Sequence, residues 1–153
     1  MNITIERAQA KDALKLIEVQ NRSFYDDYVL YGLCPSYDES EEAMRKHIST
    51  ALVYKILSDG ELIGDMIVVK MENSCYYLRV IAVVPEYWGF RVGTKAMEYI
   101  EKDNPNAVEW SLITPNLSYR NHHFYEKLGY VKVGERPEPG HDTLVLWQYR
   151  KTM

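Results

Sequence analysis

The chain has 153 residues, 46% of them hydrophobic and 26% charged, a balance typical of globular domains and unlike that of disordered or collagen-like chains. A net charge of -4 argues against binding to a nucleic-acid backbone. The two cysteines lack CxxC spacing and the four histidines lack zinc-ligand spacing, so neither a disulfide framework nor a metal site is indicated.

The length predicts a single domain spanning residues 1–153. The N-terminal segment has no apolar core of the kind found in signal peptides, and no stretch approaches the roughly 20 apolar residues of a membrane span. We therefore expect a cytoplasmic protein that does not insert into a membrane.

The first third of the sequence predicts a strand, a helix, a loop and a second, short helix. Alternation at Ile3–Ile5 indicates an edge strand, and apolar residues at helical spacing from Ala13 to Phe24 indicate a helix. Residues 25–37 combine four tyrosines with Gly and Pro, and we predict an aromatic loop there. Asp38-x-x-Glu41 has the spacing of a capping box, which predicts that Asp38 begins a helix ending at residues 45–47.

The rest of the sequence predicts strands interrupted by two helices. Asp59-Gly60 marks a tight hairpin turn, and the apolar run ending at Val84 is typical of a central strand covered on both faces. This mixed order predicts an α+β fold with helices on both sides of a partly antiparallel sheet. The remaining predicted elements are strands at 52–57, 62–71, 76–84, 108–113, 130–135 and 143–149, and helices at 92–103 and 117–128.

The turn between the strand at 76–84 and the helix at 92–103 is a candidate anion site. Its two glycines, Gly89 and Gly93, lie four residues apart. The first amides of a helix have no internal partner and face the positive end of the helix dipole, so they can hold a phosphate. The segment matches neither a P-loop nor a dinucleotide-binding fingerprint, and an ordinary glycine-containing turn explains it equally well.

A second candidate site lies in the segment 114–130. Tyr125 lies on or beside the apolar face of a short helix closed by Gly129, where its hydroxyl can donate a proton to a leaving thiolate. A core tyrosine with a satisfied hydroxyl is the alternative interpretation. His122 and His123 are adjacent and face different ways, and we expect them at surface or supporting positions.

The two motifs, in this order and spacing, resemble those of the GNAT superfamily of N-acetyltransferases. That family has a pyrophosphate loop of the form Q/R-x-x-G-x-G/A and a later helix that often ends in a FYEKLGF-like string, and residues 124–130 read FYEKLGY. The wider string RNHHFYEKLGY at 120–130 resembles a subgroup of these enzymes. The resemblance implies a three-layer fold whose central sheet has about seven mostly antiparallel strands, covered by helices on both faces.

The resemblance also implies a function. It points to an N-acetyltransferase that moves an acetyl group from acetyl-CoA to a primary amine by direct attack in a ternary complex, and to a homodimer. Tyr125 matches the tyrosine that protonates the coenzyme A thiolate. Backbone groups of Ile81 to Val83 would pair with the pantetheine arm as an added strand does, and amides of Gly89 to Thr94 would hold the pyrophosphate. The residues implied in cofactor binding are Ile81, Ala82, Val83, Trp88, Gly89, Phe90, Arg91, Val92, Gly93, Thr94, Asn121, Phe124 and Lys127.

Three residues depart from the family pattern. Trp88 stands where the family usually has Gln or Arg, Arg91 where it usually has Gly, and Ser118 where it usually has Asn or Asp. A side chain at Arg91 removes the freedom of glycine, but its guanidinium can itself pair with a phosphate. These departures leave the strength of cofactor binding open.

A general base is harder to assign, because the strand at 76–84 contains no carboxylate. Asp65 shares a strand face with Ile63 and Ile67, and burial there would raise its pKa and make it a candidate catalytic base. Asp65 also follows Gly64, and a position at a bulge or strand edge facing water is the interpretation we favour. An ordered water is another candidate base.

The acceptor side is predicted from aromatic residues. Tyr25, Tyr28 and Tyr31, together with His141 in the loop 138–142, would suit a cationic amine through ring faces and charge; a packed aromatic loop is equally consistent. Two other functions stay open: a non-catalytic acyl-CoA-binding protein, and a peptide-binding module that uses the Tyr25–Tyr37 segment. The sequence does not distinguish a small amine, an antibiotic, a polyamine or a protein terminus as acceptor.

Overall fold

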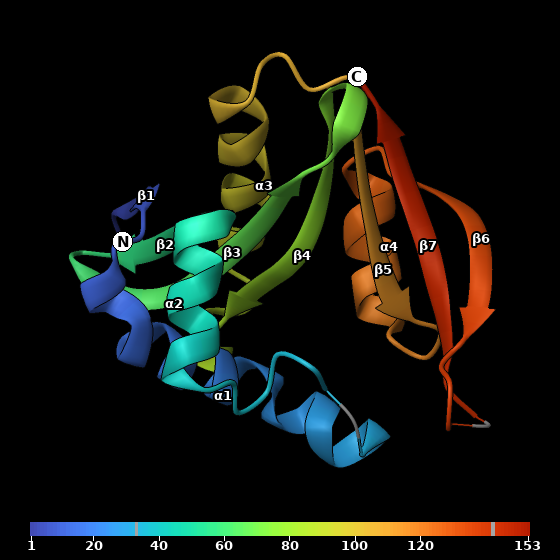
Figure 1. Ribbon diagram of the computed structural model, residues 1–153, viewed down its shortest axis with the longest axis horizontal. Coiled ribbons are helices and arrows are strands. Elements are labelled where there is room, and N and C mark those ends of the chain that lie inside the picture. Colours follow the sequence, from blue (N-terminus) through green and yellow to red (C-terminus); the bar gives the residue numbers. More distant parts are fainter. Residues whose placement is uncertain (33, 142) are drawn as a thin grey trace. The chain divides into compact units, whose positions relative to one another are not determined.

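The computed structural model describes residues 1–32, 34–141 and 143–153 and shows a mixed fold of helices and strands (Figure 1). The seven strands have the sheet order β1-β2-β3-β4-β5-β7-β6. β4 pairs with β5 in parallel, whereas β1–β2, β2–β3, β5–β7 and β6–β7 are antiparallel. The α+β fold and the mostly antiparallel sheet are therefore confirmed.

The element order also matches the predicted one. The strands are β1 (Ile3–Arg7), β2 (Leu52–Ser58), β3 (Glu61–Lys70), β4 (Cys75–Val83), β5 (Glu109–Pro115), β6 (Val131–Pro137) and β7 (Val145–Thr152). The helices are α1 (Ala13–Tyr31), α2 (Glu41–Thr50), α3 (Val92–Asp103) and α4 (Tyr119–Lys127), with short 3-10 turns η1 (Ala10–Asp12), η2 (Glu72–Ser74) and η3 (Pro85–Tyr87).

The chain divides into two compact units. Unit 1 contains residues 1–69 and 80–105, and unit 2 contains residues 70–79 and 106–153. β4 runs through both, with residues 75–79 in unit 2 and 80–83 in unit 1. In the described part of the chain, no helix combines the length and the apolar character needed to cross a membrane.

Unit 1 carries helices on both faces of its strands. On one face, α1 and α2 pack through Leu16 and Met44 against Val53 of β2 and Ile67 of β3. On the opposite face, Tyr54 of β2 contacts α3, where its hydroxyl donates a 2.6 Å hydrogen bond to Asp103. Successive side chains of β2 point to opposite faces of the strand, so Val53 faces α1 and α2 whereas Tyr54 faces α3.

Unit 2 is built on the antiparallel ladder of β5, β7 and β6. Trp110 of β5 and Tyr149 of β7 are fully buried, and α4 packs on this ladder through Tyr125, whose ring centroid lies 6.1 Å from that of Tyr149. The helix ends at Lys127 and is closed, as predicted, by Gly129, which has φ 97°; the amide of Tyr130 then donates a 3.1 Å hydrogen bond to the Tyr125 carbonyl. This bond closes the last turn in the manner of a Schellman cap.

Three local predictions are wrong. The aromatic loop begins later than predicted, because α1 continues to Tyr31 and ends at Gly32, whose φ of 68° suits a helix stop. The second helix begins after Ser40 instead of at Asp38, because the Ser40 hydroxyl caps the Ala43 amide at 3.0 Å, and it continues to Thr50. The strand buried on both faces is β3, whereas β4 alternates between buried and partly exposed residues.

Candidate active site

The turn before α3 has the geometry of an anion site. The cap residue Arg91 makes no side-chain capping bond, and the first turn of α3 carries no acidic residue. The first helical hydrogen bond runs from the Lys95 amide to the Arg91 carbonyl at 3.1 Å, so the amides of Val92, Gly93 and Thr94 come before it and are available to a ligand. The residues present therefore fit a bound phosphate or pyrophosphate.

Two residues of this turn have a left-handed backbone conformation, which gives the turn its shape. Gly89 has φ 87° and Arg91 has φ 62°. A Cβ at Gly89 would meet no atom within 4 Å, so the backbone conformation, and not lack of space, favours glycine there. Arg91 adopts the same left-handed region although it has a side chain, and this backbone conformation costs about 1 kcal/mol or more.

The Trp88 side chain links the turn to the end of β4 by a hydrogen bond. Its indole Nε1 donates a 2.6 Å hydrogen bond to the Val83 carbonyl. Val83 is one of the residues predicted to pair with the pantetheine arm, and one acceptor position of its carbonyl is thus already used. Within unit 1, β4 is the edge strand beside β3, so Ile81 and Ala82 also lie on a strand with one side unpaired in this unit.

In unit 2, Tyr125 lies on the buried face of α4. It is 7% exposed, and burial, followed by the nearby Tyr77, raises the pKa of its hydroxyl well above the ordinary value. The hydroxyl therefore keeps its proton at neutral pH. Phe124 contacts the Tyr125 ring edge to face at 5.2 Å, and the Asn121 amide donates a 3.4 Å hydrogen bond to the Thr114 hydroxyl.

Of the two histidines predicted at surface or supporting positions, His123 is exposed, whereas His122 lies in the core of unit 2. It is 6% exposed, stacks on Trp147 at 4.1 Å, and its Nε2 lies 2.9 Å from the Pro115 carbonyl oxygen. Leu117, predicted on the face of this helix, precedes α4 and is 49% exposed. The buried face of α4 is thus formed by His122 and Tyr125.

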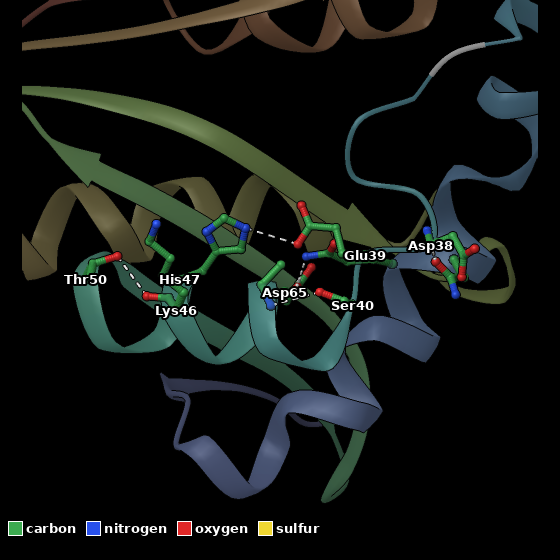
Figure 2. Close-up of polar contacts among 10 residues, drawn as sticks. Asp38, Glu39, Ser40, Lys46, His47, Thr50 and Asp65 are labelled. Atoms are coloured by element: carbon green, nitrogen blue, oxygen red, sulfur yellow. Dashed lines mark hydrogen bonds and ion pairs between the residues drawn. The ribbon is translucent and has the colours of Figure 1, made fainter.

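The pairing of β2 and β3 shifts register beside Asp65, where Ile56 pairs with Gly64 and Leu57 with Leu62, but Asp65 does not face water, and that part of the favoured interpretation is wrong. Asp65 is fully buried in β3 and accepts a 2.6 Å hydrogen bond from the Gln20 side chain of α1. Burial raises the pKa of Asp65 to about 8. The negative charge of Glu39, which is drawn with Asp65 in Figure 2, also raises this pKa, whereas the hydrogen bond from Gln20 lowers it. The sequence pattern contained no sign of Gln20 or Glu39, because the contacts bring together residues distant in the chain.

The predicted acceptor residues are only partly brought together. Tyr28 stacks on Tyr37 at 4.5 Å, and Tyr25 lies 6.3 Å from the same ring, so Tyr37 is a member of the cluster that the prediction left out. Tyr31 is the last residue of α1. His141 lies in the β6–β7 loop of unit 2, where its amide bonds the Glu138 carbonyl at 3.0 Å; Asp142 of the same loop lies outside the described residues.

Comparison with known proteins identifies the family. The profile of the acetyltransferase (GNAT) family matches residues 13–130. The chain belongs to the GNAT family. The matched region runs from the start of α1 to the residue before β6 and contains both motifs, and it confirms the resemblance and the acetyltransferase class, with acetyl-CoA as the cofactor of this GNAT domain.

The chain also matches a curated protein over part of its length. The uncharacterized protein YrkN of Bacillus subtilis (strain 168) is 33% identical over 95 residues, which cover 61% of this chain and 50% of YrkN. The chain thus spans about half the length of this curated relative.

Solved structures show the same GNAT fold. The PaiA N-acetyltransferase of Thermoplasma acidophilum, in complex with coenzyme A, has a TM-score of 0.82 at 21% identity, with 100% of both chains covered. The ribosomal-protein-S18-alanine N-acetyltransferase of Escherichia coli has a TM-score of 0.80 at 15% identity, with 99% of this chain and 94% of that chain covered.

Proposed function

We propose that this protein is an acetyl-CoA-dependent N-acetyltransferase that acetylates a primary amine. The observation that carries the proposal is the uncapped first turn of α3, which follows the left-handed Gly89 and Arg91 in a chain of the GNAT family. A phosphate-bearing cofactor satisfies those amides and the positive end of the helix dipole together.

The residues proposed to hold the cofactor lie on two elements of unit 1. Amides from Gly89 to Thr94 hold the pyrophosphate, with the Arg91 guanidinium as an added cation. Backbone groups of Ile81 to Val83, on the edge strand β4, pair with the pantetheine arm. For Asn121, Phe124 and Lys127 of α4, which belong to unit 2, a role in cofactor binding stays a prediction from the sequence. Acetyl-CoA supplies the reactive acetyl thioester.

Two side chains are proposed to move protons. Tyr125 holds a proton at its Oη at neutral pH, because burial raises its pKa, and this proton is proposed to serve the leaving sulfur. Asp65 is proposed as the base that removes a proton from the acceptor. Its pKa of about 8 lies close to the working pH, as general-base catalysis requires.

The acceptor class follows from the groups on unit 1. Tyr25, Tyr28 and Tyr37 form an aromatic cluster of the kind that contacts ammonium groups. One protein of the same fold is described as a ribosomal-protein-S18-alanine N-acetyltransferase, so we propose a primary amine without choosing between a small molecule and a protein. A homodimer and a cytoplasmic location stay predictions.

The test begins with calorimetric titration of the protein with acetyl-CoA, with ATP and NAD as controls, repeated on Tyr125→Phe. We expect binding of acetyl-CoA alone, largely kept in the variant, and acetyl transfer to a panel of amines reduced about 10²–10⁴-fold by Tyr125→Phe. Binding without turnover would favour a non-catalytic acyl-CoA-binding protein. Absence of binding would contradict the proposal and favour the peptide-binding module.

A further inference from the structure

The Val83 carbonyl lies on the open edge that β4 has within unit 1. A Cβ at Gly64 of β3 would lie 2.3 Å from the Ala82 carbonyl oxygen, and the Val84 amide donates a 2.9 Å hydrogen bond to the Ile63 carbonyl of β3. Ala82 and Val84 therefore direct backbone groups toward β3. Because adjacent residues of a strand direct these groups to opposite sides, the Val83 carbonyl points away from β3.

The Trp88 indole covers this carbonyl. Its Nε1 donates a 2.6 Å hydrogen bond to the Val83 oxygen, so the ring of this half-buried side chain lies beside the strand edge. Backbone groups on a strand edge can pair with another extended chain, and the indole satisfies one of them from within unit 1. A strand-like ligand that pairs with β4 at Val83 meets the indole first.

The backbone of Trp88 is fixed by the 3-10 turn η3 that precedes it. The Trp88 amide donates a 3.1 Å hydrogen bond to the Pro85 carbonyl, and Glu86 of the same turn forms an ion pair with Arg22 of α1. These contacts involve the backbone or other side chains of the turn. The indole can therefore leave the Val83 carbonyl by rotation about its own side-chain bonds, while the turn stays in place.

The phosphate part of the proposed cofactor site does not use this bond. The amides of Val92, Gly93 and Thr94 come after Trp88 in the chain and before the first helical hydrogen bond of α3, so they are available to a ligand in either position of the indole. A ligand that carries the pyrophosphate but no pantetheine arm can thus occupy the turn while the indole stays on Val83.

We propose that Trp88 is a gate for the pantetheine arm: its indole closes the edge of β4 in the free protein and releases the Val83 carbonyl when the arm binds. The inference rests on the proposed acetyl-CoA-dependent function and adds a residue that sets ligand selectivity at the same site. The indole N–H and an amide N–H of the arm are both donors to one oxygen. Binding of the arm therefore breaks one hydrogen bond within the protein.

The first test compares two ligands by calorimetric titration. Acetyl-CoA carries the arm, whereas 3′-phospho-ADP carries the same nucleotide and phosphates without it. Trp88→Phe removes the N–H donor and keeps an aromatic ring, so it should bind acetyl-CoA about 2–10-fold more tightly than wild type, as expected for one net hydrogen bond. Its affinity for 3′-phospho-ADP should equal that of wild type.

The matched control is Tyr87→Phe, which changes the neighbouring residue of the same turn and keeps the indole. It should bind both ligands as wild type does. Unchanged or weaker binding of acetyl-CoA by Trp88→Phe would overturn the gate, and a loss of affinity for both ligands would show that the indole supports the phosphate turn instead. Absence of acetyl-CoA binding in both wild type and Trp88→Phe would contradict the proposed function and the gate together.

The second test follows the indole by fluorescence. The chain has three tryptophans, of which Trp110 is fully buried and Trp147 is stacked on His122. Acetyl-CoA should change the emission of wild type, because Trp88 moves, and 3′-phospho-ADP, which carries the same adenine, should not. The change should be absent in Trp88→Phe.

Equal changes with the two ligands, or a change that persists in Trp88→Phe, would contradict release of the indole. The comparison of the two ligands on wild type needs no variant, so it can reject the gate even if Trp88→Phe folds poorly. Neither test requires acetyl transfer.

Discussion

At the scale of single residues, Arg91 combines a favourable charge with an unfavourable backbone. Its φ of 62° at the cap of α3 is a conformation that glycine adopts without strain. Its positive charge, in return, belongs to the cap residue of a helix whose dipole already favours anions. Arg91 therefore has two separate effects, the strain of its backbone and the charge of its side chain, and a single substitution to glycine would remove both.

Comparing Arg91→Gly with Arg91→Ala distinguishes these properties. Both variants lose the guanidinium, but only alanine keeps the left-handed strain, so Arg91→Gly should have a free energy of unfolding about 1 kcal/mol higher than Arg91→Ala. Urea unfolding measures the difference. Both variants should bind acetyl-CoA more weakly than wild type; equal stabilities would show that the turn relaxes around alanine.

Asp65 gives the second residue-scale prediction, which concerns stability and pH. Its pKa rises from 3.8 to about 8 on folding, so the folded protein binds more protons than the unfolded chain between these values, and the free energy of unfolding falls as pH rises through that window. Asp65→Asn should flatten this dependence and be more stable than wild type at pH 8, on the order of a few kcal/mol.

Urea unfolding of both proteins between pH 5 and pH 8 checks this sign, with Glu42→Gln as the exposed control. Parallel stability curves for wild type and Asp65→Asn would show that Asp65 titrates equally in both states. If Asp65 serves catalysis at the expense of stability, Asp65→Asn should be more stable than wild type and should lose acetyl transfer.

At the scale of elements, the start of α2 depends on one hydroxyl. The Ser40 side chain accepts from the Ala43 amide at 3.0 Å. Ser40→Ala should therefore lower the free energy of unfolding by about 1 kcal/mol, as measured by urea unfolding. Ser49→Ala is the matched control, because Ser49 lies in the last part of the same helix, where its hydroxyl bonds the Lys46 carbonyl; an equal loss in both variants would contradict the capping role.

Patterns within one element predicted the fold well. Val92, Ala96, Met97 and Ile100 have helical spacing, and all four are buried in α3. The Asp59-Gly60 turn has positive φ at both residues, 49° and 85°, as a tight hairpin requires. In both cases the structure depends on a few neighbouring residues, namely on the spacing of apolar side chains or on residues that tolerate positive φ. Such local determinants can be predicted from the sequence alone.

Predictions failed where local signals competed or where contacts were distant. Gly32 and Pro35 suggested a loop, although Tyr25, Tyr28 and Tyr31 have the spacing of a helix face, and α1 continues through them. The burial of Asp65 depends on residues far along the chain, such as Gln20, and no pattern around position 65 reports that contact. The motifs at α3 and α4 therefore give site residues that stay predictions, and the acceptor side has no motif of this kind.

At the scale of the whole molecule, an acidic protein is proposed to bind an acidic cofactor. The net charge is -4, so the attraction must come from a local group of amides and cations and not from the overall field. The described turn before α3 provides such a group, with Arg91 at its cap and no acidic residue in the first turn.

Cofactor binding should consequently stabilise the folded chain. Acetyl-CoA at about 100 times its Kd should add about 2.7 kcal/mol to the free energy of unfolding and raise Tm by roughly 5–10 °C. Scanning calorimetry with acetyl-CoA and with ATP checks this. An equal rise with ATP would indicate a general phosphate site without selectivity for the pantetheine arm.

Gly64, next to Asp65, has a consequence for how this sequence can vary. A Cβ at this position would lie 2.3 Å from the Ala82 carbonyl oxygen of β4, which is closer than two unbonded atoms can approach, and that oxygen belongs to the backbone and cannot turn aside. Any residue larger than glycine would force β3 and β4 apart beside the buried acid. In a library that randomises position 64, we therefore expect only glycine among the clones that keep a folded protein.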